Sequence, residues 1–168
     1  MNIRKTTLQD LPRLPEIYER ARAFMAAHGN PDQWGKNNWP PRALIEQDIA
    51  AGQSYVCEDD EKRIVGTFFM AFGKDVEPTY AAITDGAWRD ESPYGVVHRI
   101  ASDGTQKGVG TYCLNWAYAQ CGHIRIDTHG DNIVMQNLLN KLGYRRCGTI
   151  YVPQDSAPRI AFEKSRTK

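Results

Sequence analysis

The sequence predicts an α/β (α+β) protein in which a mixed central sheet is flanked by helices on both faces. Two observations carry this prediction. Strand and helix periods alternate along the chain, and a strand, a glycine-bearing loop, a helix, a strand and a second helix follow one another between Tyr94 and Tyr144. Two hairpins complete the element order, and such a layout implies a mixed sheet covered on both sides.

Length and charge limit the class of protein. The 168 residues fit one domain, 1–168, that is long enough to bury a core. The 21 basic and 20 acidic residues give a formal charge of +1, which offers no reason to propose a nucleic acid or a membrane surface as partner. The oligomeric state stays open between monomer and homodimer.

The composition also bears on the compartment. No apolar run approaches the ~18 residues of a transmembrane helix, and Met1–Lys5 lacks the apolar run of a signal peptide. The cysteines show no CxxC spacing and are expected to be reduced, small apolar residues: Cys57, Cys113, Cys121 and Cys147. We therefore expect a cytoplasmic protein.

The first half of the chain is expected to open with a strand at Ile3–Lys5, followed by two helices. Asp10 is a suitable cap for the first helix, whose apolar residues keep helical spacing until Gly29. A loop with two tryptophans, His28–Pro41, leads to a second helix over Arg42–Ala51.

Three strands are expected next. Ser54–Glu58 and Arg63–Phe72 flank an acidic turn and predict a hairpin. The aromatic-bearing segment Gly73–Pro93 has no regular period, and the strand Tyr94–Ala101 follows it.

The second half begins with a helix that starts near Val109 and is stopped by Gly122. The strand His123–Thr128 follows, and Asp131 is expected to cap the last helix. The buried stripe of that helix is predicted to be Val134, Met135, Leu138, Leu139 and Leu142. Cys147–Val152 and Arg159–Glu163 predict a closing hairpin.

Polar clusters lie at two joints of this half, Ala101–Thr111 and Ile126–Asn132. A strand that feeds a glycine-rich turn at the start of a helix leaves backbone N–H groups free, and the helix dipole favours an anion there. Glycine at positions 108 and 110 lets a pyrophosphate approach the backbone closely. The two joints together predict a phosphate-bearing cofactor.

Both joints resemble motifs of the GNAT superfamily of acyl-CoA-dependent N-acyltransferases. The family pattern Arg/Gln-x-x-Gly-x-Gly/Ala is matched by Thr105-Gln106-Lys107-Gly108-Val109-Gly110 in its glycines, whereas the leading position departs from it unless Gln106 serves one place later. The second motif is matched by Ile124–Thr128, Asp131-Asn132 and Lys141-Leu142-Gly143-Tyr144. The resemblance covers the whole chain in element order.

The resemblance implies that acetyl-CoA donates an acetyl group to a primary amine of a small molecule or peptide, by direct attack in a ternary complex. It implies that the strands Tyr94–Ala101 and His123–Thr128 splay apart and admit the pantetheine arm. The residues expected to bind acetyl-CoA are Ile100, Ala101, Thr105, Gln106, Lys107, Gly108, Val109, Gly110, Thr111, Asn132, Met135 and Leu139.

His98 is the candidate general base, because relatives commonly supply a base from this strand directly or through water. An imidazole with its ordinary pKa of ~6.5 is mostly neutral at pH 7. The alternative is a structural histidine bonded to a carboxylate. Strand alternation points Arg99 the opposite way, toward a substrate carboxylate, the cofactor or a structural ion pair.

The usual family acid is absent. Many relatives place a tyrosine five residues before the final aromatic of the last helix, and here that residue is Leu139. Tyr144 is a weak substitute. The thiolate, whose free thiol has a pKa of ~8.5, then leaves unassisted or takes a proton from water.

A second constellation lies on the strand that ends near Thr128. His123, Asp127 and His129 share parity, so a zinc or iron site is an alternative, although Arg125 on the same face opposes a cation. The favoured interpretation is that Asp127 and His129 serve the acyl site, as catalytic residues or by orienting its loop.

The acceptor side is expected to come from the two aromatic loops. Aromatic residues with acidic neighbours suit a cationic amine, while the alternative is that they pack the loops onto the sheet. The candidate acceptor-binding residues are Trp34, Trp39, Tyr80, Trp88, Arg99 and Thr128. A non-catalytic acyl-CoA sensor and, less favoured, a metal-dependent enzyme remain the other function classes.

Overall fold

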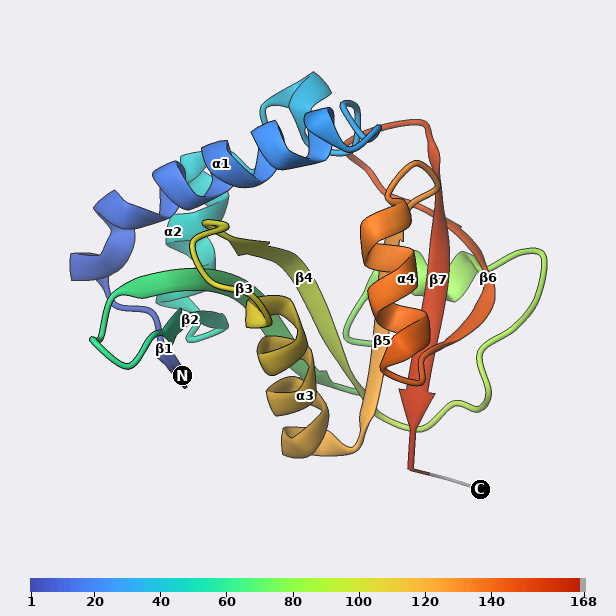
Figure 1. The fold of residues 1–168 in the computed structure, drawn as a ribbon. Coiled ribbons are helices and arrows are strands. Elements are labelled where there is room, and N and C mark those ends of the chain that lie inside the picture. The colour runs from blue at the N-terminus through green and yellow to red at the C-terminus, as the bar shows by residue number, and fades with distance from the viewer. Residues whose placement is uncertain (167–168) are drawn as a thin grey trace.

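The computed structural model describes residues 1–166 and contains a seven-stranded sheet with four α-helices (Figure 1). The strand order is β1-β2-β3-β4-β5-β7-β6. Neighbouring strands are antiparallel except β4 and β5, which are parallel. This is the mixed sheet that the sequence predicts.

The elements follow the predicted order. The strands are β1 (Asn2–Lys5), β2 (Ser54–Glu58), β3 (Ile64–Gly73), β4 (Tyr94–Ser102), β5 (His123–His129), β6 (Arg145–Tyr151) and β7 (Pro158–Ser165). The α-helices are α1 (Leu14–Ala27), α2 (Arg42–Ala50), α3 (Val109–Cys121) and α4 (Ile133–Lys141). Short 3₁₀ helices lie at η1 (Leu8–Arg13), η2 (Gly35–Asn37) and η3 (Pro78–Ala82).

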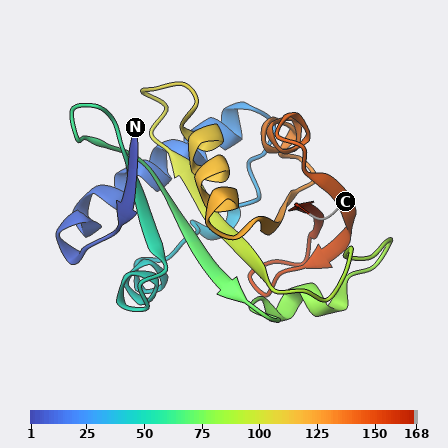
Figure 2. The same cartoon turned by 90° about the horizontal axis from the view of Figure 1, so that it is seen from below.

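Helices cover both faces of the sheet, because successive strand residues point to opposite sides. In β2, Cys57 packs with residues of α3 and α4, whereas the neighbouring Val56 packs with residues of α1 and α2. Under β5 and β7 the second face is covered by η3, whose Tyr80 is 1% exposed. Figure 2 shows α3 and α4 on one side of the strands and α2 and η3 on the other.

The parallel strands β4 and β5 part soon after they meet. They pair only at Gly95 with Ile124 and at Val96 with Arg125. Beyond those positions the two strands diverge, and α1 crosses above the opening (Figure 1). The predicted splaying of these strands is therefore present, and it divides the sheet into two halves joined at one end.

A β-bulge in β4 corrects the expected orientation of Arg99. The register between β3 and β4 shifts between Thr67 and Phe69, and Arg99 has φ +53°. A bulge breaks the alternation of side chains. As a result the His98 ring stacks 5.8 Å from the Phe69 ring while the Arg99 guanidinium lies 4.6 Å above that same ring. Both side chains thus lie on one face, not on opposite faces.

Two helix starts differ from the sequence prediction. Asp10 does not cap α1; it accepts the backbone N–H of Thr7 at 2.7 Å, and η1 precedes the α-helix. α4 is capped by Asn132 and not by Asp131, because the Asn132 side chain accepts the Met135 N–H at 3.0 Å. Asp10 lies within η1, and Arg13, the N-cap residue of α1, makes no side-chain cap hydrogen bond, whereas Asp131 lies one residue before the cap of α4.

Smaller corrections concern the last elements. His129 was expected past the end of its strand, yet it pairs with Arg159 within β5. Val134 was expected in the buried stripe of α4 but is 44% exposed. β6 begins at Arg145 and β7 extends to Ser165, because cross-strand pairing continues past the apolar core of each predicted strand. Within residues 1–166, every helix is too short or too polar to cross a bilayer.

Candidate active site

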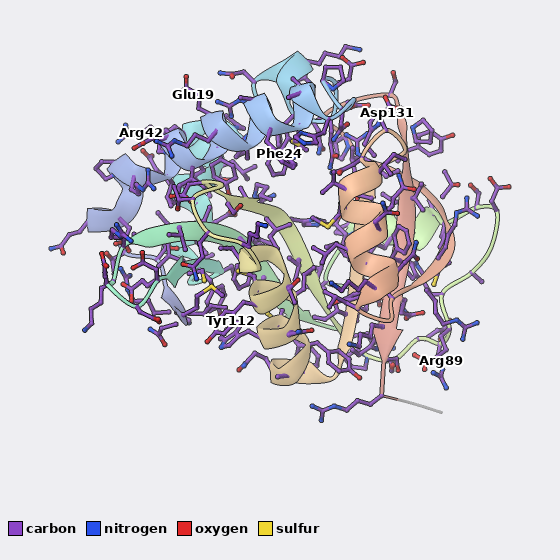
Figure 3. The ribbon with its side chains drawn as sticks, in the orientation of Figure 1. Glu19, Phe24, Arg42, Arg89, Tyr112 and Asp131 are labelled. Carbon is purple, nitrogen blue, oxygen red and sulfur yellow. The ribbon has the colours of Figure 1, made fainter. Side chains whose placement is uncertain are left out.

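A cavity of about 730 Å³ opens where β4 and β5 part. Its walls come from α1, the loop between α1 and α2, β4, β5, α4 and the β6–β7 loop. Figure 3 shows Phe24 on the side of α1 that faces β4 and α4, and Glu19 on the opposite side. A volume of this size fits a small-molecule or cofactor site.

His98 lines this cavity from β4 and bonds to a carboxylate, as the alternative of a structural histidine predicts, although the sequence did not identify the partner. Its Nε2 lies 2.7 Å from Oε2 of Glu77, in the loop before η3. Because a carboxylate oxygen only accepts, Nε2 carries the hydrogen of this bond. Nδ1 is therefore the ring nitrogen that is left for another partner.

Glu77 is ionised throughout the neutral pH range. Burial alone raises its pKa, but hydrogen bonds from His98 and from the hydroxyl and N–H of Thr79 outweigh burial and lower the pKa to about 2. A charged carboxylate that accepts a hydrogen bond from Nε2 fixes the orientation and the tautomer of the His98 ring.

Asp127 lies on the other side of the His98 ring. Its Oδ1 is 3.8 Å from Nδ1 of His98 and accepts a 2.6 Å hydrogen bond from the hydroxyl of Tyr80. Among residues 1–166 nothing donates to Oδ2, and Asp127 lines the cavity. Burial, with the nearby Asp127 carboxylate, raises the pKa of Tyr80 well above its usual value, so that the phenol stays protonated and keeps donating.

Arg99 is committed to an ion pair. Its guanidinium donates to Oδ2 of Asp48 in α2 at 2.7 and 3.0 Å, although Arg99 also lines the cavity. Burial raises the pKa of Asp48, while the Arg99 charge opposes that rise. Of the roles considered for Arg99, the structural ion pair is the one present.

The predicted pyrophosphate loop lies at the start of α3. Gly108 has φ +83° and precedes a helix whose N-terminus carries no side-chain cap, so the first-turn N–H groups of Val109, Gly110 and Thr111 have no helical acceptor. Gln106 and Lys107 are exposed beside it. Thr105 is exposed as well, but its hydroxyl and N–H both donate to Asp103 at 2.6 and 2.9 Å.

The cavity wall from α4 contains Asn132, Met135 and Leu138. The Asn132 amide also donates to Gln33 Oε1 at 3.0 Å, which ties α4 to the loop after α1. Leu139, predicted to contact the cofactor, is fully buried in the core instead. The helical turn directs Leu139 toward the sheet and leaves the neighbouring Leu138 at the cavity.

Ile100, Ala101 and Thr128 line the cavity from the two splayed strands. Trp34 and Trp39 line it from the α1–α2 loop. Trp88 and Tyr80 do not line it.

Trp88 is instead part of the packing beneath β5. Its Nε1 donates to the Tyr80 carbonyl at 2.8 Å, and Arg125 stacks 4.6 Å above its ring. The structure therefore corrects the predicted acceptor contact for Trp88, because η3 draws this loop under the sheet. Tyr80 contacts two residues that line the cavity: it donates to Asp127, and its ring meets the His98 ring edge-on at 6.1 Å.

The structure does not bring His123, Asp127 and His129 together. His123 bonds to Glu163 at 2.6 Å beneath the far end of β5. His129 lies outside the cavity wall, where its Nδ1 accepts the Asp131 N–H at 3.0 Å and so orients the loop before α4. No group of three or more His, Cys, Asp or Glu residues in the described part of the chain is arranged to hold a metal ion.

Glu77 and Tyr80 were missed in their present roles because both lie in an irregular segment without a motif. Glu77 is 21 positions away from His98 in the sequence, so no local sequence pattern indicates that the two side chains meet. The acidic and aromatic character of residues 73–93 was the available hint.

No family model and no curated protein matches the chain, so its similarity to known proteins comes from solved structures. The chain is similar to a GNAT-family acetyltransferase from Streptococcus agalactiae 2603, with 31% identity, a TM-score of 0.88, and coverage of 99% of this chain and 96% of that one.

Two further solved structures share the fold at lower identity. One is a phosphinothricin acetyltransferase from Sinorhizobium meliloti in complex with AcCoA, with 14% identity, a TM-score of 0.62, and coverage of 97% of this chain and 86% of that one. The other is a ribosomal-protein-alanine N-acetyltransferase from Brucella melitensis, with 16% identity, a TM-score of 0.65, and coverage of 98% and 99%.

Proposed function

This chain belongs to the GNAT acetyltransferase family, and from that premise we propose that it transfers an acetyl group from acetyl-CoA to a primary amine of a small molecule or peptide. The amine attacks directly in a ternary complex. The observation that carries this proposal is His98, held by Glu77 at 2.7 Å in the cavity between the splayed strands. Acetyl-CoA supplies the activated acetyl thioester.

The residues at the start of α3 fit the phosphates of acetyl-CoA. Three first-turn N–H groups that have no acceptor within the helix, beside the exposed Lys107, are donors of the kind that bind an anion at a helix N-terminus. Thr105 is excluded from this set because Asp103 already takes both of its donors. The Asp103 carboxylate in turn pairs with Arg13 at 2.7 Å, which offsets its negative charge.

The pantetheine arm is assigned to the gap between β4 and β5. Beyond Val96 the facing edge of β4 has no pairing with β5, so main-chain groups at Ile100 and Ala101 face the cavity from an unpaired edge. Met135 and Leu138 add apolar surface from α4, and Asn132 adds an amide. This combination supports the binding of an extended, mostly apolar arm with amide groups.

His98 is the proposed general base. Glu77 holds the Nε2–H, so Nδ1 of the neutral ring is the lone pair that takes a proton from the acceptor ammonium. The resulting imidazolium is stabilised between Glu77 and Asp127. Oδ2 of Asp127 is proposed to accept a hydrogen bond from the ammonium before the proton moves.

No protein acid is assigned to the leaving thiolate. The described cavity wall contains no tyrosine or cysteine, and Tyr144 is 4% exposed with its hydroxyl buried and unpartnered. Burial raises the pKa of Tyr144. A thiol of ordinary pKa ~8.5 is a tolerable leaving group near neutral pH, so water is the proposed proton source.

Two measurements test the proposal. Calorimetric titration should detect acetyl-CoA binding that Gly110→Asp abolishes and Gly110→Ala retains. Gly110 has no positive φ, its added Cβ meets only Leu138 Cδ2 at 3.3 Å, and an aspartate in the first turn favours the helix, so both variants should fold. Equal affinity of the folded aspartate variant would remove the phosphate assignment.

The second measurement is acetyl-CoA-dependent thiol release with an amine panel. His98→Gln should lower the rate ~10²–10⁴-fold at neutral pH, with acetyl-CoA affinity unchanged. The loss should shrink at high pH, where the amine is already deprotonated. Tight acetyl-CoA binding without turnover on any amine would favour the non-catalytic sensor instead.

A further inference from the structure

The acceptor end of the cavity has an apolar wall on one side. We call this the α1–α2 wall: Phe24, Met25, Trp34, Trp39 and Leu44. Phe24 is 48% exposed on the cavity side of α1, although large apolar side chains are usually covered (Figure 3). Its ring stacks 3.9 Å from that of His28, which holds it at the rim.

The opposite side of this end is negatively charged. Glu77 and Asp127 flank the single imidazole of His98, so this cluster has a net charge of −2 with a neutral ring and −1 with a protonated one. Both carboxylates line the cavity, where partial burial strengthens their field. Such a cluster attracts one ammonium group and repels an acidic group placed near it.

The guanidinium groups at the cavity wall are already paired. Arg99 lies 2.7 Å from Asp48, Arg159 lies 2.9 Å from Asp155, and Arg20 lies 3.5 Å from Glu16. Arg159 is 2% exposed, so its charge is committed to its partner. Within the described cavity wall, these arginines are the cationic side chains. A carboxylate or phosphate on the acceptor would therefore have to displace Asp48 from Arg99 or Asp155 from Arg159, whose pairs are largely buried, whereas the pair of Arg20 is half-exposed and weak.

We infer that the acceptor is a primary amine with a single positive charge and an aromatic or aliphatic body, without a carboxylate or phosphate group. The inference rests on the proposed amine acetylation and names its substrate class. The ammonium lies at Asp127 and His98, and the body packs on the α1–α2 wall. A second ammonium at the far end of the acceptor would meet apolar side chains and lose its hydration.

The test uses two matched pairs of acceptors. Phenethylamine and phenylalanine differ by a carboxylate, and pentylamine and 1,5-diaminopentane differ by a terminal ammonium. In acetyl-CoA-dependent thiol release, kcat/KM should be at least ~10-fold higher for the first member of each pair, the effect of about 1.4 kcal/mol. Equal or reversed rates within the pairs would overturn the inference, as would turnover of none of the four by enzyme that binds acetyl-CoA.

Binding without the cofactor separates this inference from the proposed function. Trp34 and Trp39 line the cavity, so intrinsic fluorescence should report each amine on the protein alone. Phenethylamine should bind more tightly than phenylalanine even if acetyl-CoA does not bind. The reverse order would overturn the inference, whatever the outcome for acetylation.

Variants locate the body of the acceptor. Trp39→Ala should raise the KM for phenethylamine ~10-fold while acetyl-CoA affinity holds, because contact area is lost on the acceptor side only. Trp116→Ala is the matched control, since the Trp116 ring packs on Tyr55 and Phe68 and Trp116 lies outside the cavity wall. An unchanged KM in a folded Trp39→Ala variant would contradict the assigned wall.

Discussion

The hydroxyl of Tyr18 in α1 donates a 3.0 Å hydrogen bond to the backbone carbonyl of Arg99, the residue at the β4 bulge. The Arg99 side chain is held at the same time by Asp48 of α2. Two helices therefore fix one residue whose φ of +53° is unfavourable for a side chain other than glycine. The residue before Arg99 is His98, the proposed general base. The contacts of α1 and α2 with Arg99 therefore help to fix the position of His98.

Tyr18→Phe tests that connection. It leaves the Arg99 carbonyl without its donor, and we expect unfolding in urea to show a loss of about 1–3 kcal/mol, the cost of an unsatisfied buried acceptor. The acetylation rate should fall by on the order of 10-fold, because small misplacements of a base are costly. Tyr112→Phe is the control: it removes a 2.7 Å bond to the Met1 carbonyl, and Tyr112 lies outside the cavity wall. Equal rate losses in both variants would show that the bulge has no special role.

Glu77→Gln should change how the free energy of unfolding depends on pH under acidic conditions. The pKa of Glu77 is lowered from 4.5 to about 2, so its contribution is complete above pH 4.5 and is lost as pH falls toward 2. The shift corresponds to at most about 3 kcal/mol. The unfolding free energy of the parent should therefore fall more steeply between pH 4.5 and 2 than that of the variant. Glu46→Gln, at an exposed pair with Arg42, should follow the parent.

Leu139→Tyr should not restore an acid. Leu139 is fully buried in a core that leaves no room for a phenol, so we expect a lower melting temperature and a loss of about 1–3 kcal/mol. Leu138→Tyr is the variant that presents a hydroxyl to the cavity. If thiolate departure limits the rate, Leu138→Tyr should accelerate turnover while Leu139→Tyr should not. Faster turnover by a stable Leu139→Tyr enzyme would contradict this packing.

Asn132 caps α4 and is also a predicted contact of acetyl-CoA, and two variants distinguish these two roles. Asn132→Ala should cost about 1 kcal/mol of unfolding free energy, whereas Asn132→Ser keeps an acceptor for the Met135 N–H and should recover most of it. If the Asn132 amide binds acetyl-CoA directly, both variants should lose the ~0.5–1.5 kcal/mol of one hydrogen bond in calorimetry. Full recovery of affinity by serine would instead make the role purely structural.

Sequence determined the features that depend on neighbouring residues. The start of α3 at Val109 and its end before Gly122 follow from glycines that adopt φ values of +83° and +70°. The order of strands and helices follows from apolar period, and the splayed pair follows from the family resemblance that the two motifs carry. These signals are local, so no knowledge of packing is needed to find them.

Tertiary structure decided which side chains meet. Glu77 reaches His98 across 21 positions, and Tyr80 reaches Asp127 across 47, because η3 folds under the sheet. Strand alternation placed Arg99 on the wrong face, because a bulge depends on the partner strand and not on the residue itself. Leu138 and Leu139 are equally apolar, and only the packing of α4 against the sheet sends one into the core and leaves the other at the cavity.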